Sequence, residues 1–146
     1  MSFHQFVYIS TAVPDISHTD LDAILCSARE FNHRHEITGM LLFCKRTFMQ
    51  VLEGEKESIQ NLMEQRINRD RRHYGIHMVN ESVIPQRSFA DWSMGFSALD
   101  GVVLAEKNYT RFLEEGFTTE LVTQHLDVAH KLLLSFRDVD DGVTQS

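Results

Sequence analysis

The stretch ITGMLLFCKRTFMQVLEG, residues 37–54, predicts two neighbouring β-strands. Residues 37–44 form an apolar run, and residues 47–53 carry bulky side chains at nearly every position. Short runs of this kind, bounded by breaks, favour strands over helices. Only Lys45 and Arg46 separate the two runs, without the glycine or asparagine that a tight hairpin prefers. We therefore expect two strands joined by a short turn of unusual sequence.

Further strands and helices are predicted on both sides of this pair. Strands are expected over residues 4–10, 76–84 and 89–98, and helices over about 17–33, 55–68, 103–114 and 118–136. This order predicts an α+β protein with a ferredoxin-like βαββαββ sheet and two helices on one face. The other face of the sheet also carries apolar side chains, and we expect the C-terminal helices to cover it. The last ten residues are expected to fray.

The composition is that of one ordinary globular domain of 146 residues, with 42% hydrophobic and 24% charged residues. A net charge of -7 disfavours nucleic acids and anionic membranes as broad partners. No apolar run approaches the roughly 18 residues of a membrane span, and the N-terminus lacks a signal-peptide pattern. Cys26 and Cys44 are interpreted as reduced, partly buried thiols, with a disulfide as the alternative. We expect a cytoplasmic protein.

Three polar side chains stand where the core pattern predicts apolar ones. Tyr8 lies on the strand face assigned to the two-helix side, and Gln50 lies between Phe48 and Leu52 on a face of the same kind. Asn32, near the end of the first helix, is a third such group. A buried amide or phenol needs hydrogen-bond partners, so together they could line a pocket for a polar, planar ligand. Taken singly, each has a plainer interpretation: strand packing for Tyr8, an exposed edge for Gln50, and a helix C-cap for Asn32.

A cluster of positive charge interrupts the acidic chain. The run contains Arg66, Arg69, Arg71, Arg72 and His73, with Asp70 among them. Such a cluster can hold a phosphate or diphosphate through charge-assisted hydrogen bonds. The alternative is a cationic helix C-terminus, which the helix dipole favours without any ligand.

The segment WSMGF, residues 92–96, places Trp92, Met94 and Phe96 on one face of the last predicted strand. Core packing is the plain interpretation of these side chains. His33 and His35 are two residues apart, which is the wrong spacing for a metal site on one helix face. No common nucleotide-binding or hydrolase motif is present.

These segments, taken together, resemble the BLUF photoreceptors, the sensors of blue light using FAD. The matching pieces are FVYIS with Tyr8, REFN with Asn32, ITGMLLF, FMQVLEG with Gln50, RINRDRRH, and FADWSMGF with Trp92 and Met94. Order and spacing match from residue 3 to about 98. The resemblance implies a flavin-binding domain over residues 1–98, with FAD held non-covalently between the two helices. Residues 99–146 are then a C-terminal helical extension, and we expect no separate output domain.

The resemblance also implies roles for particular residues. The tyrosine matching Tyr8 is the photochemical electron and proton donor, and the glutamine matching Gln50 links it to flavin N5 or C4=O. The asparagine matching Asn32 bonds the carbonyl edge of the ring. Met94, with Trp92, passes the change to the last strand. The expected cofactor-binding set is Tyr8, Ile24, Asn32, Phe48, Gln50, Leu52, Arg66, Ile67, Asp70 and His73.

Two positions depart from the family pattern. Phe31 stands where several members have a second asparagine, and Ala28 where some have serine. They affect the expected contacts to the flavin tail and leave the photochemistry as implied. Whether the amide of Gln50 rotates or tautomerises is open.

The expected function is therefore a blue-light receptor without enzymatic activity. It would signal by contact with a downstream protein of unknown identity, and we expect a homo-oligomer, a dimer or a larger ring. We expect no membrane partner and no direct nucleic-acid binding. Two other functions stay open: a flavin redox enzyme on the same scaffold, and a ferredoxin-like regulatory module for another small ligand.

Overall fold

A five-stranded mixed sheet runs through the centre of the protein in the strand order β4-β1-β3-β2-β5. The computed structural model describes residues 3–90, 93–100 and 109–138. β1 pairs antiparallel with both β3 and β4, β2 pairs antiparallel with β3, and β5 joins β2 in parallel. The strands are β1 (Phe3–Ala12), β2 (Thr38–Cys44), β3 (Thr47–Gly54), β4 (His73–Ile84) and β5 (Gly95–Ala98).

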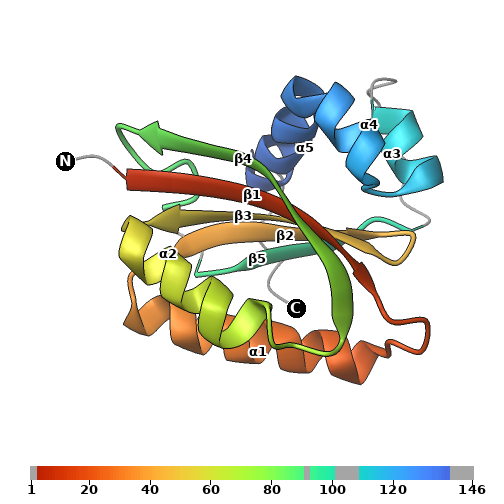
Figure 1. Ribbon diagram of the computed structural model, residues 1–146. Coiled ribbons are helices and arrows are strands. Elements are labelled where there is room, and N and C mark those ends of the chain that lie inside the picture. The colour runs from red at the N-terminus through yellow and green to blue at the C-terminus, as the bar shows by residue number, and fades with distance from the viewer. Residues whose placement is uncertain (1–2, 91–92, 101–108, 139–146) are drawn as a thin grey trace.

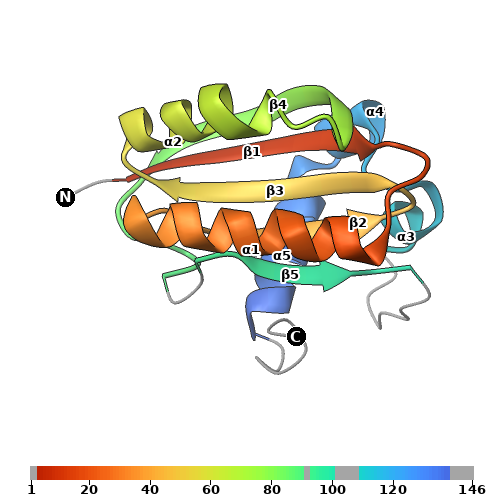
Figure 2. The same cartoon turned by 90° about the horizontal axis from the view of Figure 1, so that it is seen from below.

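Helices cover both faces of this sheet (Figure 1). On one face lie α1 (His18–Arg34) and α2 (Lys56–Leu62), which continues into the π-helical turn η1 (Met63–Ile67). Figure 2 looks onto this face, where β1 and β3 are seen between α2 and α1. The other face carries α3 (Thr110–Glu115), α4 (Thr119–Gln124) and α5 (Leu126–Asp138). The predicted α+β fold class, with two helices on one face and C-terminal helices on the other, is confirmed.

The two-residue alternation of the strands divides the buried side chains into two clusters, one on each face. In β3, Phe48 and Leu52 belong to the cluster under α1 and α2, whereas Met49 and Val51 belong to the cluster under α3–α5. Because the central strands are buried on both faces, every position of β3 is shielded from solvent. Polar side chains on these strands, Gln50 among them, are therefore buried.

The β2–β3 turn is a tight hairpin despite its sequence. Lys45 and Arg46 both adopt positive φ, 49° and 60°, which is the conformation of the hairpin turns that usually contain glycine or asparagine. Neighbouring groups hold it: the Lys45 N–H donates to the Asp100 carboxylate at 3.1 Å, and the Ala12 N–H donates to the Arg46 carbonyl at 2.8 Å. Within β2, Gly39 is required because a Cβ there would lie 2.0 Å from the Val51 carbonyl oxygen.

The predicted strand over residues 89–98 is wrong for the described residues before Gly95. β5 begins only at Gly95, and residues 88–90 form bends and a turn. The N–H groups of Ser88 and Phe89 donate to the buried carboxylate of Glu53, each at 2.9 Å, so they take no part in a strand ladder. Trp92, which was placed on this strand, lies outside the described residues.

The C-terminal helices also differ from their predicted bounds. The single helix expected over residues 118–136 is interrupted at His125, which separates α4 from α5. Of the helix expected over residues 103–114, only residues 109–114 lie in the described chain, where α3 begins at Thr110. Cys26 is exposed, contrary to the expected partial burial, and Cys44 is buried; neither is in a disulfide. None of the described helices is both long and apolar enough to cross a membrane.

Candidate functional site

A cavity of about 360 Å³ opens between α1, η1 and the face of the sheet that these helices cover. This volume lies within the range of roughly 300–1,000 Å³ that is typical of small-molecule sites. Its walls are apolar side chains from both helices and the sheet, with a few polar groups that converge on the interior. The apolar lining comprises Ile24, Ala28, Phe31, Leu41, Phe48, Leu62 and Ile67.

The phenol of Tyr8 and the amide of Gln50 meet in the floor of the cavity. They lie directly opposite each other in the β1–β3 register, and the Tyr8 hydroxyl donates to Gln50 Oε1. Burial, and then the charge of Asp70, raise the pKa of Tyr8 far above its ordinary value. Tyr8 therefore remains neutral and keeps its proton, which its hydroxyl donates to the oxygen of the amide.

The other end of that amide is held by Met94. Gln50 Nε2 donates to the thioether Sδ of Met94 at 3.3 Å, and the Met94 side chain is buried. This contact orients the amide of Gln50. Because a thioether is only a weak acceptor, little energy is needed to break the contact. Tyr8, Gln50 and Met94 thus form a chain of hydrogen bonds from the floor of the cavity to the start of β5.

Asn32 contributes a buried acceptor that no donor in the described part of the chain uses. Its side chain is fully buried, and its Nδ2 donates to the carbonyl of Ser93 at 2.8 Å. The Oδ1 atom is buried and has no hydrogen-bond partner among residues 3–90, 93–100 and 109–138, and Asn32 lines the cavity. An unsatisfied buried amide oxygen costs about 1–3 kcal/mol, which a ligand with an N–H group would recover. α1 continues to Arg34 with His35 as its C-cap, so the helix-cap interpretation of Asn32 is wrong.

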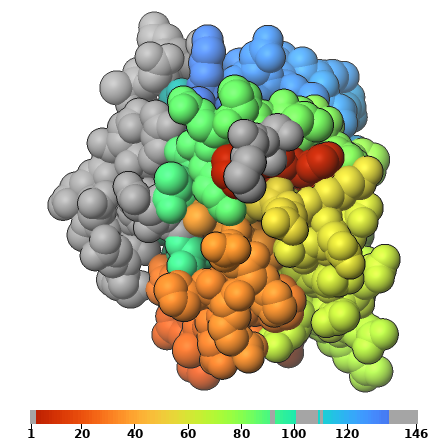
Figure 3. Space-filling view, turned by 90° about the vertical axis from the view of Figure 1, so that its left-hand side faces the viewer, coloured from red at the N-terminus to blue at the C-terminus, as the bar shows by residue number. Residues whose placement is uncertain are grey.

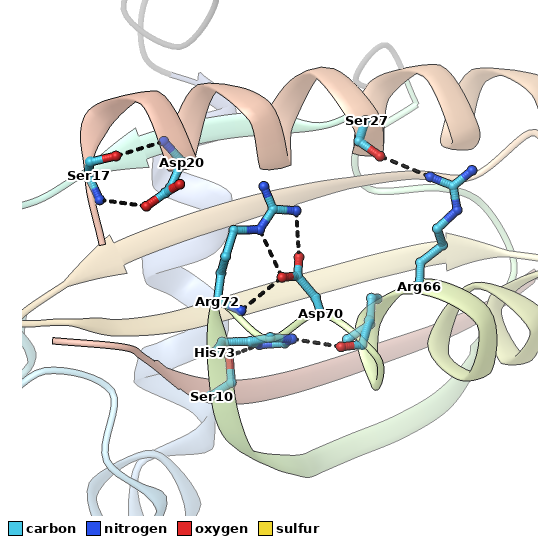
Figure 4. Close-up of polar contacts among 9 residues, drawn as sticks. Ser10, Ser17, Asp20, Ser27, Arg66, Asp70, Arg72 and His73 are labelled. Carbon is cyan, nitrogen blue, oxygen red and sulfur yellow. Dashed lines mark hydrogen bonds and ion pairs between the residues drawn. The ribbon is translucent and has the colours of Figure 1, made fainter. Parts of the chain in front are cut away.

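A network of side chains organises the segment after η1 (Figure 4). Arg72 donates to both carboxylate oxygens of Asp70, at 2.8 and 2.9 Å. Burial alone raises the pKa of Asp70, but the hydrogen bonds and charge of Arg72 outweigh it and hold that pKa below its ordinary value. His73 bridges the Ser10 hydroxyl at 2.8 Å and the Ile67 carbonyl at 2.7 Å. Since a carbonyl can only accept, Nε2 of His73 carries a proton.

Arg66 reaches across the mouth of the cavity from η1 to α1 (Figure 4). Its Nη1 donates to the Ser27 hydroxyl at 3.0 Å, and its guanidinium lies 5.0 Å from the centre of the Phe31 ring. Arg69 and Arg71 are exposed and line the same cavity. The arginines of the charge cluster therefore have different surroundings. Arg72 is paired with Asp70. Arg66, Arg69 and Arg71 lie around the opening, where they could bind an anionic group.

The structure brings together most of the residues predicted from the sequence. The cavity is lined by Tyr8, Ile24, Asn32, Phe48, Gln50, Arg66, Ile67, Asp70 and His73. Leu52 does not line it, because the side chain is fully buried in the core beneath. Met94 adjoins Gln50 instead of lining the cavity, and Gln50 lies in the central strand β3, so its edge-strand interpretation is wrong.

The sequence reasoning missed several residues of this site. Ser10 lines the cavity and was foreseeable, because it shares a strand face with Tyr8. Ser27 lies one helical turn before Phe31, which also gave a signal. Arg29 had no such signal: its Nε donates to the Met94 carbonyl at 2.9 Å, a contact over 65 residues of sequence.

The chemistry of the cavity fits a flavin. An isoalloxazine ring is flat and apolar on its faces and has carbonyl and N–H groups on its edge. The unsatisfied Oδ1 of Asn32 is an acceptor suited to such an N–H, and the apolar walls suit the faces of the ring. The exposed arginines at the mouth suit the phosphates of a dinucleotide.

Comparison of the sequence with known proteins gives a consistent result. The profile of the family described as "BLUF: Sensors of blue-light using FAD" matches residues 3–95. The chain is 38% identical over 88 residues to the photoactivated adenylate cyclase subunit beta of Euglena longa, and 36% identical to that of Euglena gracilis. Each match covers 60% of this chain and 10% of the relative. The chain therefore spans about a tenth of the length of these curated relatives.

Solved structures agree with the sequence match. The structure described as "BlsA ground state" superposes with a TM-score of 0.77 at 31% identity, covering 92% of this chain and 88% of that one. "BlrB - a BLUF protein, dark state structure" gives 0.69 at 25% identity, covering 89% and 97%. A bacterial light-regulated adenylyl cyclase gives 0.66 at 27% identity, covering 88% of this chain but 36% of the cyclase.

Proposed function

The chain belongs to the BLUF family of sensors of blue light using FAD, and on that premise we propose a light response in which the hydrogen bonds of Tyr8 and Gln50 rearrange. The single observation that carries the proposal is the chain of contacts from the Tyr8 hydroxyl through the Gln50 amide to Met94. Tyr8 and Gln50 lie in the wall of a cavity that Asn32 also lines, with a buried acceptor that has no partner among the described residues. FAD, the cofactor of this family, would supply blue-light absorption and, once excited, a strong oxidant.

The residues that would hold FAD are those of the cavity. Asn32 would accept from the N–H on the edge of the ring, and the apolar walls around Ile24 and Ile67 would contact its faces. Arg66 and the exposed arginines near it would bind the phosphates. None of these contacts is covalent, and the cysteines lie elsewhere.

Tyr8 and Gln50 would carry the response. Tyr8 is neutral and buried, so it has both an electron and a proton to give, and Gln50 Oε1 is placed to receive the proton. The amide of Gln50 has an acceptor end toward Tyr8 and a donor end toward Met94. If light reverses the amide, its oxygen faces the Met94 sulfur, which cannot donate, and the contact to Met94 is lost. Tautomerism would change the same two bonds.

The start of β5 would pass this change onward. β5 pairs with β2, and the residue after it, Leu99, donates to the Phe43 carbonyl at 2.8 Å. The Asp100 carboxylate then accepts from the N–H of Lys45 in the β2–β3 turn. Thr47, just after this turn, contacts the C-terminal region, because the Phe117 N–H donates to its hydroxyl at 2.6 Å.

We propose residues 1–98 as the sensory unit and residues 99–146 as the extension that reports to a partner protein. The working assembly would be a homo-oligomer in the cytoplasm.

The test is an absorption spectrum of the FAD-loaded protein in the dark and after blue light. We expect a small red shift that reverses in the dark, and its loss in Gln50→Leu. Gln60→Leu, which changes an exposed glutamine of α2, is the matched control and should keep the shift. A flavin that only bleaches, and only with added reductant, would point to a redox enzyme, and failure to bind FAD at all would rule out the proposal.

A further inference from the structure

The backbone just before β5 is held by side chains of α1 and not by the sheet. The register between β2 and β5 begins at Gly95, one residue after Met94. Arg29 Nε donates to the carbonyl of Met94 at 2.9 Å, and Asn32 Nδ2 donates to the carbonyl of Ser93 at 2.8 Å. Arg29 and Asn32 lie three residues apart and so share one face of α1. Two consecutive carbonyls are thereby fixed to this helix.

The position of this backbone matters because of the side chain that it carries. Met94 presents its thioether to Gln50 Nε2 at 3.3 Å. Methionine is unbranched and has three rotatable bonds, so packing alone defines the place of its sulfur poorly. A fixed carbonyl at the same residue limits how far the sulfur can move from the amide. Asn32 alone is a weaker anchor, because its neutral amide is a weaker donor than a guanidinium.

We propose that Arg29 is a positioning residue for the light response, which keeps Met94 within reach of Gln50. This inference rests on the function proposed above. The guanidinium is a charged donor, and a charged donor binds a partly buried carbonyl more strongly than a neutral one. When the bond between Gln50 and Met94 is broken, Arg29 holds the backbone of Met94 in place. The sulfur is then still available when the amide returns, and recovery in the dark is fast.

The direct test is the rate of dark recovery of the FAD-loaded protein with Arg29→Met, which keeps the length of the side chain but removes its donors. We expect recovery at least about threefold slower than in the unchanged protein, the size of effect that loss of one such hydrogen bond permits. Arg34→Met is the matched control, since Arg34 lies exposed at the end of the same helix, and its rate should stay within the threefold limit. A slowing of less than threefold in Arg29→Met, or a faster recovery, would overturn the proposal.

A double-mutant cycle separates positioning from a general effect on folding. In a Met94→Leu background the sulfur is absent, so adding Arg29→Met should change the recovery rate by less than about threefold. If it slows recovery as much as in the presence of Met94, Arg29 does not act through the thioether and the inference fails.

A second variant covers the case in which Arg29→Met does not retain FAD. Arg29→Gln keeps a neutral donor, and we expect a recovery rate between those of the unchanged protein and Arg29→Met, slower by about twofold or more. A smaller effect in Arg29→Gln contradicts the inference. If the unchanged protein shows no reversible red shift, the proposed function fails; if it does and the Arg29 variants match it, only this inference fails.

Discussion

Among the residues that the structure describes, Asn32 is one of those with a buried side-chain atom that has no hydrogen-bond partner. One end of its amide is bonded to Ser93, and the other end is buried and unsatisfied beside the cavity. Such a group is stable only if something else bonds to it, because a buried polar atom loses its hydration without compensation. We therefore propose two roles for Asn32: it binds the edge of the ring, and it holds the segment before β5.

Removing this amide should weaken binding of FAD. We expect Asn32→Ala to raise the dissociation constant of FAD by about tenfold or more, equivalent to about 1.4 kcal/mol. Flavin fluorescence titration measures this constant. Asn61→Ala, at an exposed position of α2, should leave it within about twofold. Equal affinities in Asn32→Ala and the unchanged protein would remove Asn32 from the binding site.

Single residues were predictable from sequence where strand periodicity decides their side. The alternation in β1 and β3 placed Tyr8 and Gln50 toward the helices, and the register then brings them opposite each other. Arg29 was not predictable, because its contact with Met94 depends on how α1 lies against a turn far along the chain. Leu52 was misplaced for a related reason: periodicity gives the face of a side chain but not its depth below a cavity.

At the scale of elements, Glu53 at the end of β3 joins several segments. Its carboxylate is completely buried and accepts from Gln5 and Thr38 and from the N–H groups of Ser88 and Phe89. Arg87 also donates to the backbone carbonyls of Glu36 and Glu53.

Figure 3 views this end of the molecule, where the start of β1 (red) lies beside green residues of β4 and the segment that follows it. Glu53 thus fixes the connection from β4 toward β5.

Loss of this carboxylate should destabilise the whole fold. Glu53→Ala leaves several buried donors without an acceptor, and we expect the free energy of unfolding to fall by at least about 2 kcal/mol. Urea denaturation followed by circular dichroism measures it. Glu57→Ala, in the exposed first turn of α2, should change it by less than about 0.5 kcal/mol. A loss below about 1 kcal/mol in Glu53→Ala would show that other groups fix this connection.

The two elements that the sequence predicted poorly have physical explanations of different kinds. The segment around Phe89 has a strand-like pattern, but the side chain of Glu53 takes the backbone donors that a strand would need. The break at His125 was not predictable, because no glycine or proline stands there and the apolar pattern continues from α4 into α5. The hairpin at Lys45 and Arg46 was correctly placed, although its positive φ angles are held by distant groups.

At the scale of the whole molecule, the sheet separates the cavity from the C-terminal helices. The cluster under α1 and α2 includes the walls of the cavity, and the cluster under α3–α5 is built around other side chains. A substitution under α3–α5 should therefore lower stability without weakening cofactor binding, whereas one at the cavity should affect both.

Two leucines test this separation. Leu132 on α5 and Leu62 on α2 are both buried, but only Leu62 lines the cavity. We expect either substitution by alanine to reduce the free energy of unfolding by about 2–5 kcal/mol. The dissociation constant of FAD should rise in Leu62→Ala and stay within about threefold in Leu132→Ala. The free energy of unfolding is measured on protein with and without FAD, and the dissociation constant of FAD by titration. An equal rise of this constant in both variants would contradict the separation.

The most direct test of the central claim is the infrared difference spectrum of the FAD-loaded protein, light minus dark. If the amide of Gln50 rearranges as proposed, it should donate a new hydrogen bond to the flavin C4=O group and lower the stretching frequency of that carbonyl. The C4=O band should return to its dark position at the rate of dark recovery. The same spectrum of Gln50→Leu should lack this band. A reversible red shift without any change at C4=O, or a C4=O shift that survives in Gln50→Leu, would contradict the account.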